Sequence, residues 1–406
     1  MSRASGSFLS GLAYYQGVPV WRHAQIIQWA LQIVSGVVVV LLVASFFANI
    51  TNAVQDRNIP HGFSFLSREY QTPIGQHFIP YESSDTYLYA FGVAATNTII
   101  VSIVGVILAI ALGTVVGVAR ISRNWLVSRT ALVYIEFFRN VPLLVQLFFW
   151  FYIVLTLPPV RQGYVFADGI YANNAGISIP WPSPPDWNTA LVWLAVALAS
   201  IIAGTVLHRI LTRREELTGR ASYPLAVGIL TAVAAAAVGW LIIGAVSGNT
   251  PFVISVPAPH GTFGRIAGGF TISGGMMALL TGLVIYTASF IAEIVRAGIQ
   301  SVGRGQTEAA RSLGLAPMAA LRHVTFPQAL RVIIPPLISQ CLNLTKNSSL
   351  AAAIGYADLT SVGKTMTQLA PAVSIYLLLM VAYLAMSLTW SLIGNLYNRR
   401  IRLVGN

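Results

Sequence analysis

The chain has 406 residues, of which 56% are hydrophobic and only 9% are charged. Soluble domains carry about 25% charged residues, so this composition excludes an ordinary water-soluble fold. The net charge of +12 does not require a nucleic-acid partner, because basic loops beside membrane spans and attraction to anionic lipid account for it. The single cysteine, Cys341, excludes disulfides and cysteine-based metal sites within the chain.

Eight apolar runs are long enough to be predicted transmembrane helices, because crossing a bilayer takes about 20 apolar residues. The first is expected to be a retained span, since it is too long for a signal-peptide core and no small-residue cleavage site follows it. The third and seventh contain polar residues and prolines, so their hydropathy is weaker. In chain order the runs are residues 26–48, 91–119, 131–157, 189–207, 223–246, 276–295, 332–354 and 373–396.

Arginine and lysine predict the orientation, since basic residues favour the cytoplasmic side. They gather between the second and third runs, the fourth and fifth, and the sixth and seventh, and again at the C-terminal end. Both termini are therefore expected in the cytoplasm. The two long outside segments, residues 49–90 and 158–188, are interpreted either as capping loops or as simple connectors.

No motif for enzymatic chemistry is recognisable in the sequence. The acidic residues lie mostly in loops, no close carboxylate pair falls within a span, and neither HExxH nor GxSxG occurs. The sequence Gly363-Lys364-Thr365 ends like a phosphate-binding loop, but Asp358 occupies the position of that loop's first glycine. We therefore expect no catalytic residues, no metal site and no ATP bound to this chain, so energy from ATP must come from a partner.

Residues 305–327, on the predicted cytoplasmic side, favour a helix, a sharp break and a second helix. The first helix is expected over residues 305–313, with Gly314 in the left-handed conformation at its end and Pro317 in the first turn of the next helix. Two small alanines on the first helix would let another backbone approach closely. This order predicts a docking element, whereas a loop that merely returns the chain would not need it.

The same stretch resembles the signature loop, or EAA motif, of ABC importer membrane subunits. That motif reads Glu-Ala-Ala, three residues, Gly, nine residues, an aliphatic residue, one residue, then a hydrophobic residue and Pro. The matching residues are Glu308, Ala309, Ala310, Gly314, Val324, Phe326 and Pro327. The resemblance implies that the cytoplasmic loop 299–330 holds a coupling helix that inserts into a groove of an ATPase subunit. The residues expected at this contact are Glu308, Ala309, Ala310, Arg311, Gly314, Pro317 and Arg322.

The flanking sequences resemble polar amino acid (histidine/glutamine-type) permeases. This resemblance covers about residues 91–157 and 276–403, and the minimal family member has five spans. Here the first span and the pair within residues 189–246 are additions, which resemble the larger general L-amino acid or glutamate/glutamine/aspartate/asparagine branch. The segments that carry the likeness are residues 134–146, 286–296, 305–311, 327–331 and 343–350 and, for the larger branch, 62–66.

The family resemblance also implies the partners and the working cycle. An ABC ATPase dimer would bind ATP and Mg and drive alternating access through the coupling loop, and a periplasmic amino-acid-binding protein would deliver the substrate. Importers need two membrane subunits. The larger branch implies a heterodimer with a second, homologous permease in the bacterial inner (plasma) membrane.

Charged residues also fall within or at the edges of the predicted core spans, where a charge costs at least ~2.5 kcal/mol and so usually pairs or faces a pathway. Glu136 and Arg139 are three residues apart on one helix face, and Glu293 and Arg296 repeat that spacing. Each pair is expected to be a structural ion pair, an inner gate or a substrate contact. Gln146 is grouped with them.

Lys346 has no acidic residue near it in sequence and stands among amide and hydroxyl side chains. Pro335 and Pro336 are expected to break the helix before it, and broken polar helices are tolerated in membranes where they line a cavity. We therefore expect this segment to line an amino acid pathway, unless Lys346 instead pairs with Glu136 or Glu293. The expected pathway residues are Tyr286, Ser289, Asn343, Lys346, Asn347, Ser348 and Ser349.

The sequence as a whole predicts an all-α integral membrane protein with about eight transmembrane helices, a five-helix importer core and three added helices. The expected divisions are an N-terminal span and outside loop, 1–90, two core parts, 91–157 and 273–406, and an inserted region, 158–272. The expected function is import of polar L-amino acids, acidic and neutral polar ones first. The alternatives are import of basic amino acids, a secondary transporter driven by an ion gradient, which would show inverted repeats and no docking elbow, and a purely structural or assembly protein.

Overall fold

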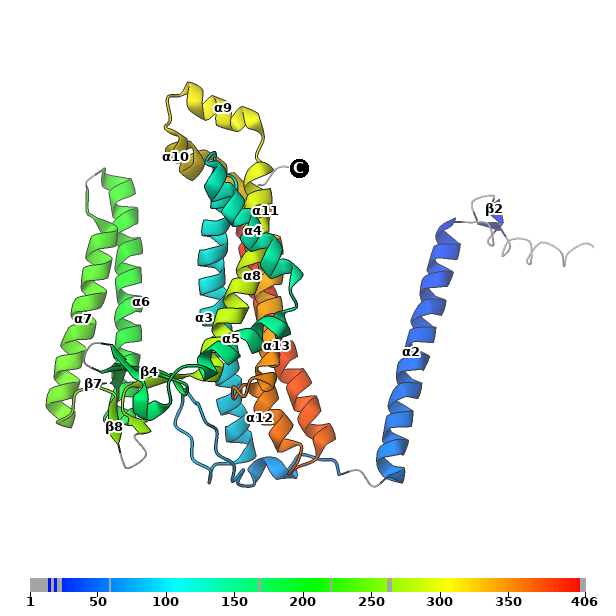
Figure 1. Ribbon diagram of the computed structural model, residues 1–406. Helices are drawn as coiled ribbons and strands as arrows, with labels where there is room; N and C mark the ends of the chain where they lie inside the picture. The colour runs from blue at the N-terminus through cyan, green and yellow to red at the C-terminus, as the bar shows by residue number, and fades with distance from the viewer. Residues whose placement is uncertain are drawn as a thin grey trace, which may run out of the picture. The chain divides into compact units, whose positions relative to one another are not determined.

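The chain divides into two compact units, one of residues 1–68 and 363–380 and one of residues 69–362 and 381–406. The computed structural model describes residues 14–15, 18–19, 24–57, 60–166, 169–219, 221–260 and 265–401 (Figure 1).

The smaller unit holds the first predicted span. Helix α2 (Ala24–Asp56) has none of its apolar window buried within this unit. A short 3-10 helix, η2 (Ser64–Ser67), follows it in sequence. Two strands of two residues each, β1 (Tyr14–Tyr15) and β2 (Val18–Pro19), form an antiparallel pair before it. An apolar helix that is exposed along its described length is suited to contact with lipid.

The larger unit is built from long helices with a short helical segment at one end (Figure 1). Its helices are α3 (Tyr87–Arg120), α4 (Trp125–Asn140), α5 (Leu143–Leu155), η3 (Val160–Gln162), α6 (Trp187–Thr218), α7 (Pro224–Ser247), α8 (Gly274–Gln300), α9 (Arg304–Ser312), α10 (Pro317–Ala320), η4 (Leu321–Thr325), α11 (Phe326–Asn347) and η5 (Ser348–Ala353). Two further helices, α12 (Leu359–Met366) and α13 (Ala372–Ile401), contribute residues to both units.

Polar side chains fix where several of these helices begin. In α3, α4, α6 and α8 the residue before the helix accepts a hydrogen bond from a backbone N–H of the first turn, which satisfies a group that has no partner within the helix. The capping residues are Thr86, Asn124, Asp186 and Ser273.

Helix α8 forms the centre of the larger unit, because α3, α4, α5 and α11 all pack against it. Glycines let these backbones meet. A Cβ at Gly117 of α3 would lie 2.6 Å from the carbonyl oxygen of Ala292, and one at Gly298 of α8 would lie 2.3 Å from the side chain of Ile333 in α11. Fully buried leucines complete the core, namely Leu147, Leu279, Leu283 and Leu344.

Six helices among the described residues are long and apolar enough to cross a membrane, or seven if the bent pair α4–α5 counts as one span. That pair bends by 105° between Asn140 and Leu143, so the third predicted run is not one straight helix. The seventh predicted run corresponds to α11 and η5, where polar residues keep the hydropathy below that of a candidate span. The count of eight spans and the orientation stay predictions, and Arg220 and Arg402, two of the basic residues behind the orientation, lie outside the described residues.

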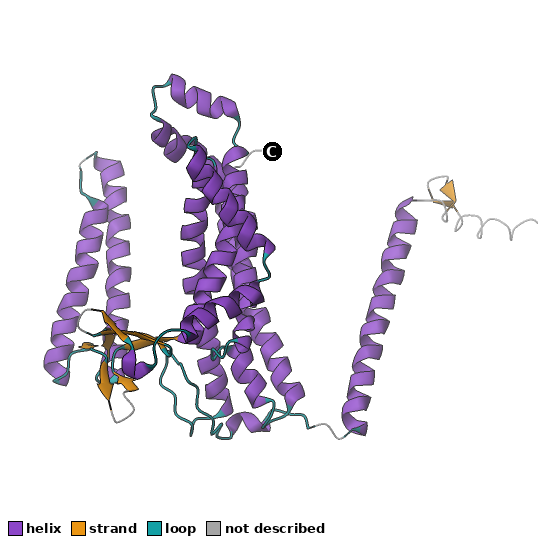
Figure 2. Ribbon diagram, viewed as in Figure 1, coloured by secondary structure: helices purple, strands orange, loops and turns teal. Residues whose placement is uncertain are grey.

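The segments before α6 and after α7 contain β-structure, which the prediction of an all-α protein did not include (Figure 2). An antiparallel sheet has the strand order β10-β5-β4-β3, with Tyr171 opposite Ser178 and Ile177 opposite Ile272. Two further antiparallel pairs join β6 to β7 and β8 to β9. The strands are β3 (Tyr164–Phe166), β4 (Ile170–Asn173), β5 (Gly176–Ile179), β6 (Trp181–Ser183), β7 (Val253–Ser255), β8 (Ala258–His260), β9 (Arg265–Ala267) and β10 (Phe270–Ser273).

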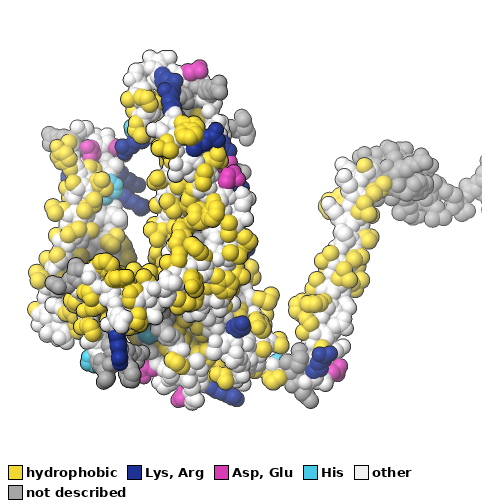
Figure 3. Space-filling view, viewed as in Figure 1, with side chains coloured by type: hydrophobic (Ala, Val, Ile, Leu, Met, Phe, Trp, Pro, Cys, Tyr) yellow, Lys and Arg dark blue, Asp and Glu magenta, His cyan; other side chains and the backbone are white. Residues whose placement is uncertain are grey.

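The strand pairing explains how the inserted helices are attached. Strands β5 and β6 precede α6 in the chain, whereas β7 and β10 follow α7, and the pairs β5–β10 and β6–β7 join these two sides. The segments that enter and leave the helix pair α6–α7 are therefore joined by these two strand pairings. Apolar side chains cover much of the visible helical surface, and arginine and lysine gather mainly toward the helix ends (Figure 3).

Candidate functional site

The predicted cytoplasmic elbow has the helix, glycine and proline order that the sequence indicated. Helix α9 is followed by Gly314 with φ +78°, and α10 begins at Pro317. The N–H of Gly314 donates to the carbonyl oxygen of Arg311 (2.8 Å), and the N–H of Leu315 donates to that of Ala310 (3.2 Å). These two bonds form a Schellman motif, whose positive φ favours glycine. The prediction of the break is confirmed.

The elbow presents apolar side chains beside charged ones. Leu313 is 82% exposed and Met318 71% exposed, and neither was singled out from the sequence. Ala310 is buried, whereas the other residues expected at the ATPase contact are exposed, namely Glu308, Ala309, Arg311, Gly314, Pro317 and Arg322. Exposed apolar residues rimmed by polar ones are typical of a protein-binding surface. The sequence did offer a signal for these two residues. Each is a large apolar residue next to a predicted helix end, at Gly314 or Pro317, within a polar segment.

A π-helical turn joins the elbow to the core. Residues Leu321–Thr325 form this turn between α10 and α11, with no loop on either side. The Gln328 side-chain amide donates to the Gln306 side-chain oxygen (3.3 Å) and to the Val324 carbonyl (3.1 Å). Through these contacts α9 is tied to the beginning of α11. Single π-turns inside helices occur frequently at functional sites.

Helix α11 remains continuous through Pro335 and Pro336, so the predicted break at these prolines is wrong. Packing against α8 and α3 keeps the helix together, as neighbouring helices commonly do for prolines in membranes. The change from α-helix to 3-10 helix comes later, at Ser348, directly after the polar segment that contains Lys346.

The residues of the expected pathway occupy different environments. Ser289 is fully buried, and its hydroxyl donates to the carbonyl oxygen of Tyr286 in its own helix (2.6 Å). Ser348 is likewise buried and donates to the carbonyl of Thr345 (2.7 Å). The remaining members are partly or fully exposed and so available to a ligand or a partner, namely Tyr286, Asn343, Lys346, Asn347 and Ser349.

One of the two predicted ion pairs forms. The Nε of Arg296 donates to a carboxylate oxygen of Glu293 (3.0 Å), and an Nη of Arg296 bonds the other oxygen, so the contact is bidentate. Glu136 and Arg139 do not pair in the described structure. Glu136 accepts a bond from the Asn140 amide (3.3 Å), and Arg139 lies 5.1 Å from the centre of the Phe290 ring, in a cation–π contact.

Gln146 takes a structural position at the bend between α4 and α5. Its buried side-chain amide donates to the carbonyl oxygens of Phe138 and Val141, both at 2.9 Å. These carbonyls belong to the end of α4, where they have no partner within the helix. Gln146 therefore stabilises the 105° bend, and its amide bonds backbone carbonyl oxygens and not a charged side chain.

Comparison with known proteins shows what kind of molecule carries this elbow. The family described as binding-protein-dependent transport system inner membrane component matches residues 105–403. The chain belongs to this family. It is accordingly a multi-pass integral membrane protein with the fold of a transporter membrane subunit.

Three relatives match nearly the full length of this transporter component. The putative amino-acid ABC transporter permease protein YhdX of Escherichia coli (strain K12) is 43% identical over 93% of this chain and 94% of its own. The general L-amino acid transport system permease protein AapQ of Rhizobium johnstonii is 41% identical over 86% and 85%. The glutamate/glutamine/aspartate/asparagine transport system permease protein BztB of Rhodobacter capsulatus is 37% identical over 90% and 92%.

The transporter component also has a buried polar network, which sequence reasoning missed. The Asn97 amide donates to the carbonyl oxygens of Gln76 (2.7 Å) and Ala357 (2.8 Å). Asp358 is fully buried, and its carboxylate accepts bonds from the backbone N–H of Ser361 (2.7 Å) and the Tyr383 hydroxyl (3.2 Å). Burial raises the pKa of Asp358 to about 6. The available signal was an aspartate directly before α12, which is a typical capping position.

Proposed function

We propose that this chain is the transmembrane permease subunit of an ATP-driven importer that carries polar L-amino acids, acidic and neutral polar ones first, across the bacterial inner membrane into the cytoplasm. Family membership supports the transporter class. The three relatives support amino acids as the substrate, because each is named as an amino acid permease, and two of the names support a broad range or one of acidic and amide residues.

The elbow is the observation that carries the coupling role. In the proposal, Leu313 and Met318 enter a groove of an ABC ATPase subunit, and Arg311 and Glu308 make charged contacts around them. The Schellman turn at Gly314 sets the angle between α9 and α10, and the π-turn continues into α11. Closure of an ATPase dimer on ATP and Mg would therefore move α11 as a unit. The ATP chemistry belongs to that partner, and this chain contributes no catalytic group.

Charge on the core surface supports a second membrane subunit. Lys346, Arg139 and Glu136 are exposed in the single chain, although charged side chains at membrane depth normally face a protein interior or a water-filled cavity. A homologous permease that covers this face would place Lys346 in a shared pathway. There its ammonium would bind a substrate carboxylate, with Asn343 and Asn347 as neighbouring amide partners. A periplasmic binding protein would deliver the substrate, and a heterodimer fits the larger branch of the family.

The decisive experiment measures amino-acid-stimulated ATP hydrolysis by the purified complex with its binding protein. Gly314→Asp should uncouple hydrolysis from glutamate or glutamine, because it puts a negative charge at the left-handed turn (φ +78°) between the apolar side chains of Leu313 and Met318. Gly303→Asp is the matched control. It adds the same charge beside the same helix, where φ is −56° and an aspartate is a favourable N-cap.

Two results would overturn the proposal. If the chain transports alone in liposomes on an ion gradient, it is a secondary transporter and the elbow docks no ATPase. If hydrolysis responds to arginine or lysine but not to glutamate or glutamine, the importer carries basic amino acids. Gly314→Asn separates the charge from the conformation, because asparagine has the same size as aspartate and also tolerates the left-handed region but is neutral, so it should retain coupling.

A further inference from the structure

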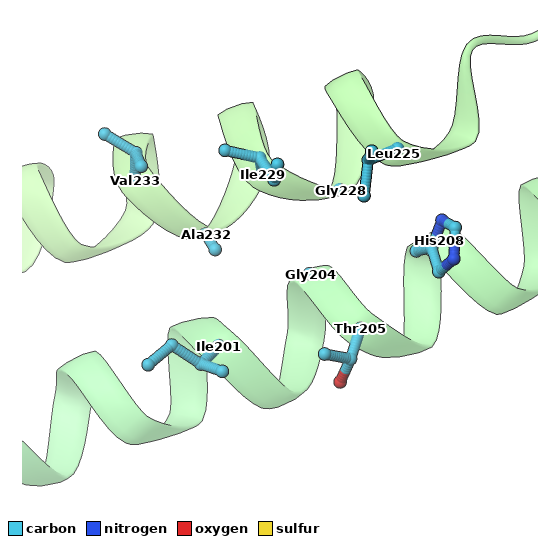
Figure 4. A pocket seen from close by; sticks show the side chains of 9 residues that line it. All are labelled: Ile201, Gly204, Thr205, His208, Leu225, Gly228, Ile229, Ala232 and Val233. Atoms are coloured by element: carbon cyan, nitrogen blue, oxygen red, sulfur yellow. The ribbon is translucent and has the colours of Figure 1, made fainter. Parts of the chain in front are cut away.

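The inserted helices α6 and α7 form a hairpin with a groove along it. Gly204 and Gly228 face each other, and a Cβ at Gly204 would lie 2.5 Å from the carbonyl oxygen of Gly228 (Figure 4). This close approach leaves an apolar groove of about 270 Å³ beside it. The groove is lined by Ile201, Gly204, Thr205, His208, Leu225, Gly228, Ile229, Ala232 and Val233.

A basic hollow adjoins this groove. His208 lines the groove and also a second hollow of about 660 Å³ along the last turns of α6, whose other polar and charged members are Arg209, Thr212, Arg213 and Glu216. Arg209 and Arg213 are one helical turn apart and exposed, and within the described structure neither forms an ion pair. Two arginines against one glutamate leave the hollow net positive.

The positions of the groove and the hollow along α6 fit one side of a bilayer: the hollow lies at the level of the headgroups and the groove lies just inside it. Arg209 is 22 residues beyond Trp187, the first residue of α6, which is about 33 Å along a helix, close to the ~30 Å thickness of the hydrocarbon core. With Trp187 at one interface, Arg209 and Arg213 reach the headgroups of the other. The groove between Ile201 and His208 then extends from that interface into the acyl region.

His208 marks the junction between groove and hollow. Its Nδ1 atom is buried and has no hydrogen-bond partner in the described structure. In Figure 4 its ring points from α6 toward α7, at the end of the groove near Leu225. This nitrogen is therefore free to form a hydrogen bond with a ligand at the end of the groove.

We propose that this groove and hollow bind one anionic phospholipid, with an acyl chain between α6 and α7, the phosphate on Arg209 and Arg213, and a glycerol or phosphate oxygen on His208. The site is separate from the elbow and from the expected amino acid pathway. It gives the insertion a function of its own, as a lipid anchor on the predicted cytoplasmic leaflet.

Native mass spectrometry of the purified complex with added phosphatidylglycerol or phosphatidylcholine tests this site. The wild type should retain one phosphatidylglycerol per chain in preference to phosphatidylcholine. Arg209→Gln with Arg213→Gln should weaken phosphatidylglycerol binding roughly 30-fold, the effect of two basic groups at a membrane surface. Arg214→Gln, an exposed arginine of the same helix outside the hollow, should change nothing.

The groove is tested by a second pair of variants. Thr205→Phe should fill it and weaken binding of the same lipid, whereas Ala203→Phe, on an exposed position outside the groove, should not. Equal retention of the two lipids, no loss in the double arginine variant, or cross-linking of Thr205→Cys to another protein in place of lipid would each overturn the proposal. Competition by inorganic phosphate alone would show an anion site without the acyl groove, which would also overturn it.

Discussion

Helices α3 and α8 of the core and helices α6 and α7 of the insertion are both pairs of long apolar helices that meet through glycines. They differ in how much they bury: the apolar windows of α8 and α3 are 56% and 33% buried, against 17% and 6% for α6 and α7. Hydrophobicity does not separate them, because lipid is as apolar as a leucine core. The neighbouring helices do, since α4, α5 and α11 also pack against α8, whereas α6 and α7 pack mainly against each other.

Polar side chains follow the same division. The core buries Thr98 and Thr345, whose hydroxyls accept hydrogen bonds from the Leu359 N–H (2.9 Å) and the Trp390 indole (2.9 Å) of other elements, whereas Ser200 is the one buried polar side chain in the described parts of α6 and α7. Buried polar groups specify a particular packing when their bonds are satisfied. The core helices are thus restricted to particular packing arrangements, whereas the surface of the insertion is suited to contact with lipid.

The largest expected effect breaks the core and spares the insertion. Gly117→Ala puts a Cβ 2.6 Å from the carbonyl oxygen of Ala292, so α3 and α8 must separate. Overpacking of this kind costs about 1–3 kcal/mol, and we expect a clear loss of melting temperature and of uptake. Gly92→Ala, on the same helix with nothing within 4 Å, is the control and should be neutral.

The same change in the insertion sharpens the comparison. Gly204→Ala meets the Gly228 carbonyl at 2.5 Å and should loosen the hairpin while uptake persists. Uptake lost as completely as in Gly117→Ala would contradict the division between core and insertion.

Next in size is an opposite response of two aspartates to pH. Because burial raises the pKa of Asp358 to about 6, the folded state binds a proton more tightly than the unfolded state, and stability falls as pH rises from about 4 to above 6. Asp358→Asn should remove this slope, on the order of 2 kcal/mol, in melting curves between pH 4.5 and 8.

Asp186, which caps the inserted helix α6, should respond with the other sign. Hydrogen bonds from the backbone N–H and hydroxyl of Thr189 lower the pKa of Asp186. The ionised Asp186 cap therefore stabilises the folded state above pH 4, and this stabilisation is lost as the pH falls through the lowered pKa. If Asp358→Asn left the dependence of stability on pH unchanged, the buried carboxylate of Asp358 would not be its cause.

A smaller effect concerns substrate alone. Lys346→Ala should raise the concentration of glutamate needed for half-maximal uptake about 10-fold, because a charge-assisted hydrogen bond contributes about 1.5–3 kcal/mol. Lys364→Ala, another exposed lysine, is the control. Unchanged affinity and rate in Lys346→Ala would exclude Lys346 from the pathway.

The smallest effect tests the cation–π contact between α4 and α8. Arg139→Gln should lower the melting temperature slightly, since an exposed contact of this kind contributes about 0.5–1 kcal/mol. Arg129→Gln, an exposed arginine on the same helix, should change it less. Equal shifts in the two variants would mean that the Phe290 contact does not stabilise the core.

Local chemistry explains what the sequence could predict. The elbow follows from a glycine and a proline three residues apart, and the apolar runs follow from composition alone. The bend at Gln146, the bond between Asn97 and Ala357, and the pairing of β5 with β10 could not be predicted, because each joins segments whose proximity depends on the finished fold. The Glu136–Arg139 pair was wrong for a related reason: spacing brings the two onto one face, but Phe290 of another helix attracts the arginine.

The π-turn at Leu321–Thr325 has a geometric consequence for the docking surface. An α-helix advances about 100° per residue, so deletion of one residue from this turn would rotate Leu313 and Met318 by about that angle around the axis of α11. The packing of Ala329 and Ile333 against Gly298 lies beyond the turn and would not change. The length of this turn therefore sets the direction in which the elbow presents Leu313 and Met318, whereas the residues after the turn set how α11 packs on α8.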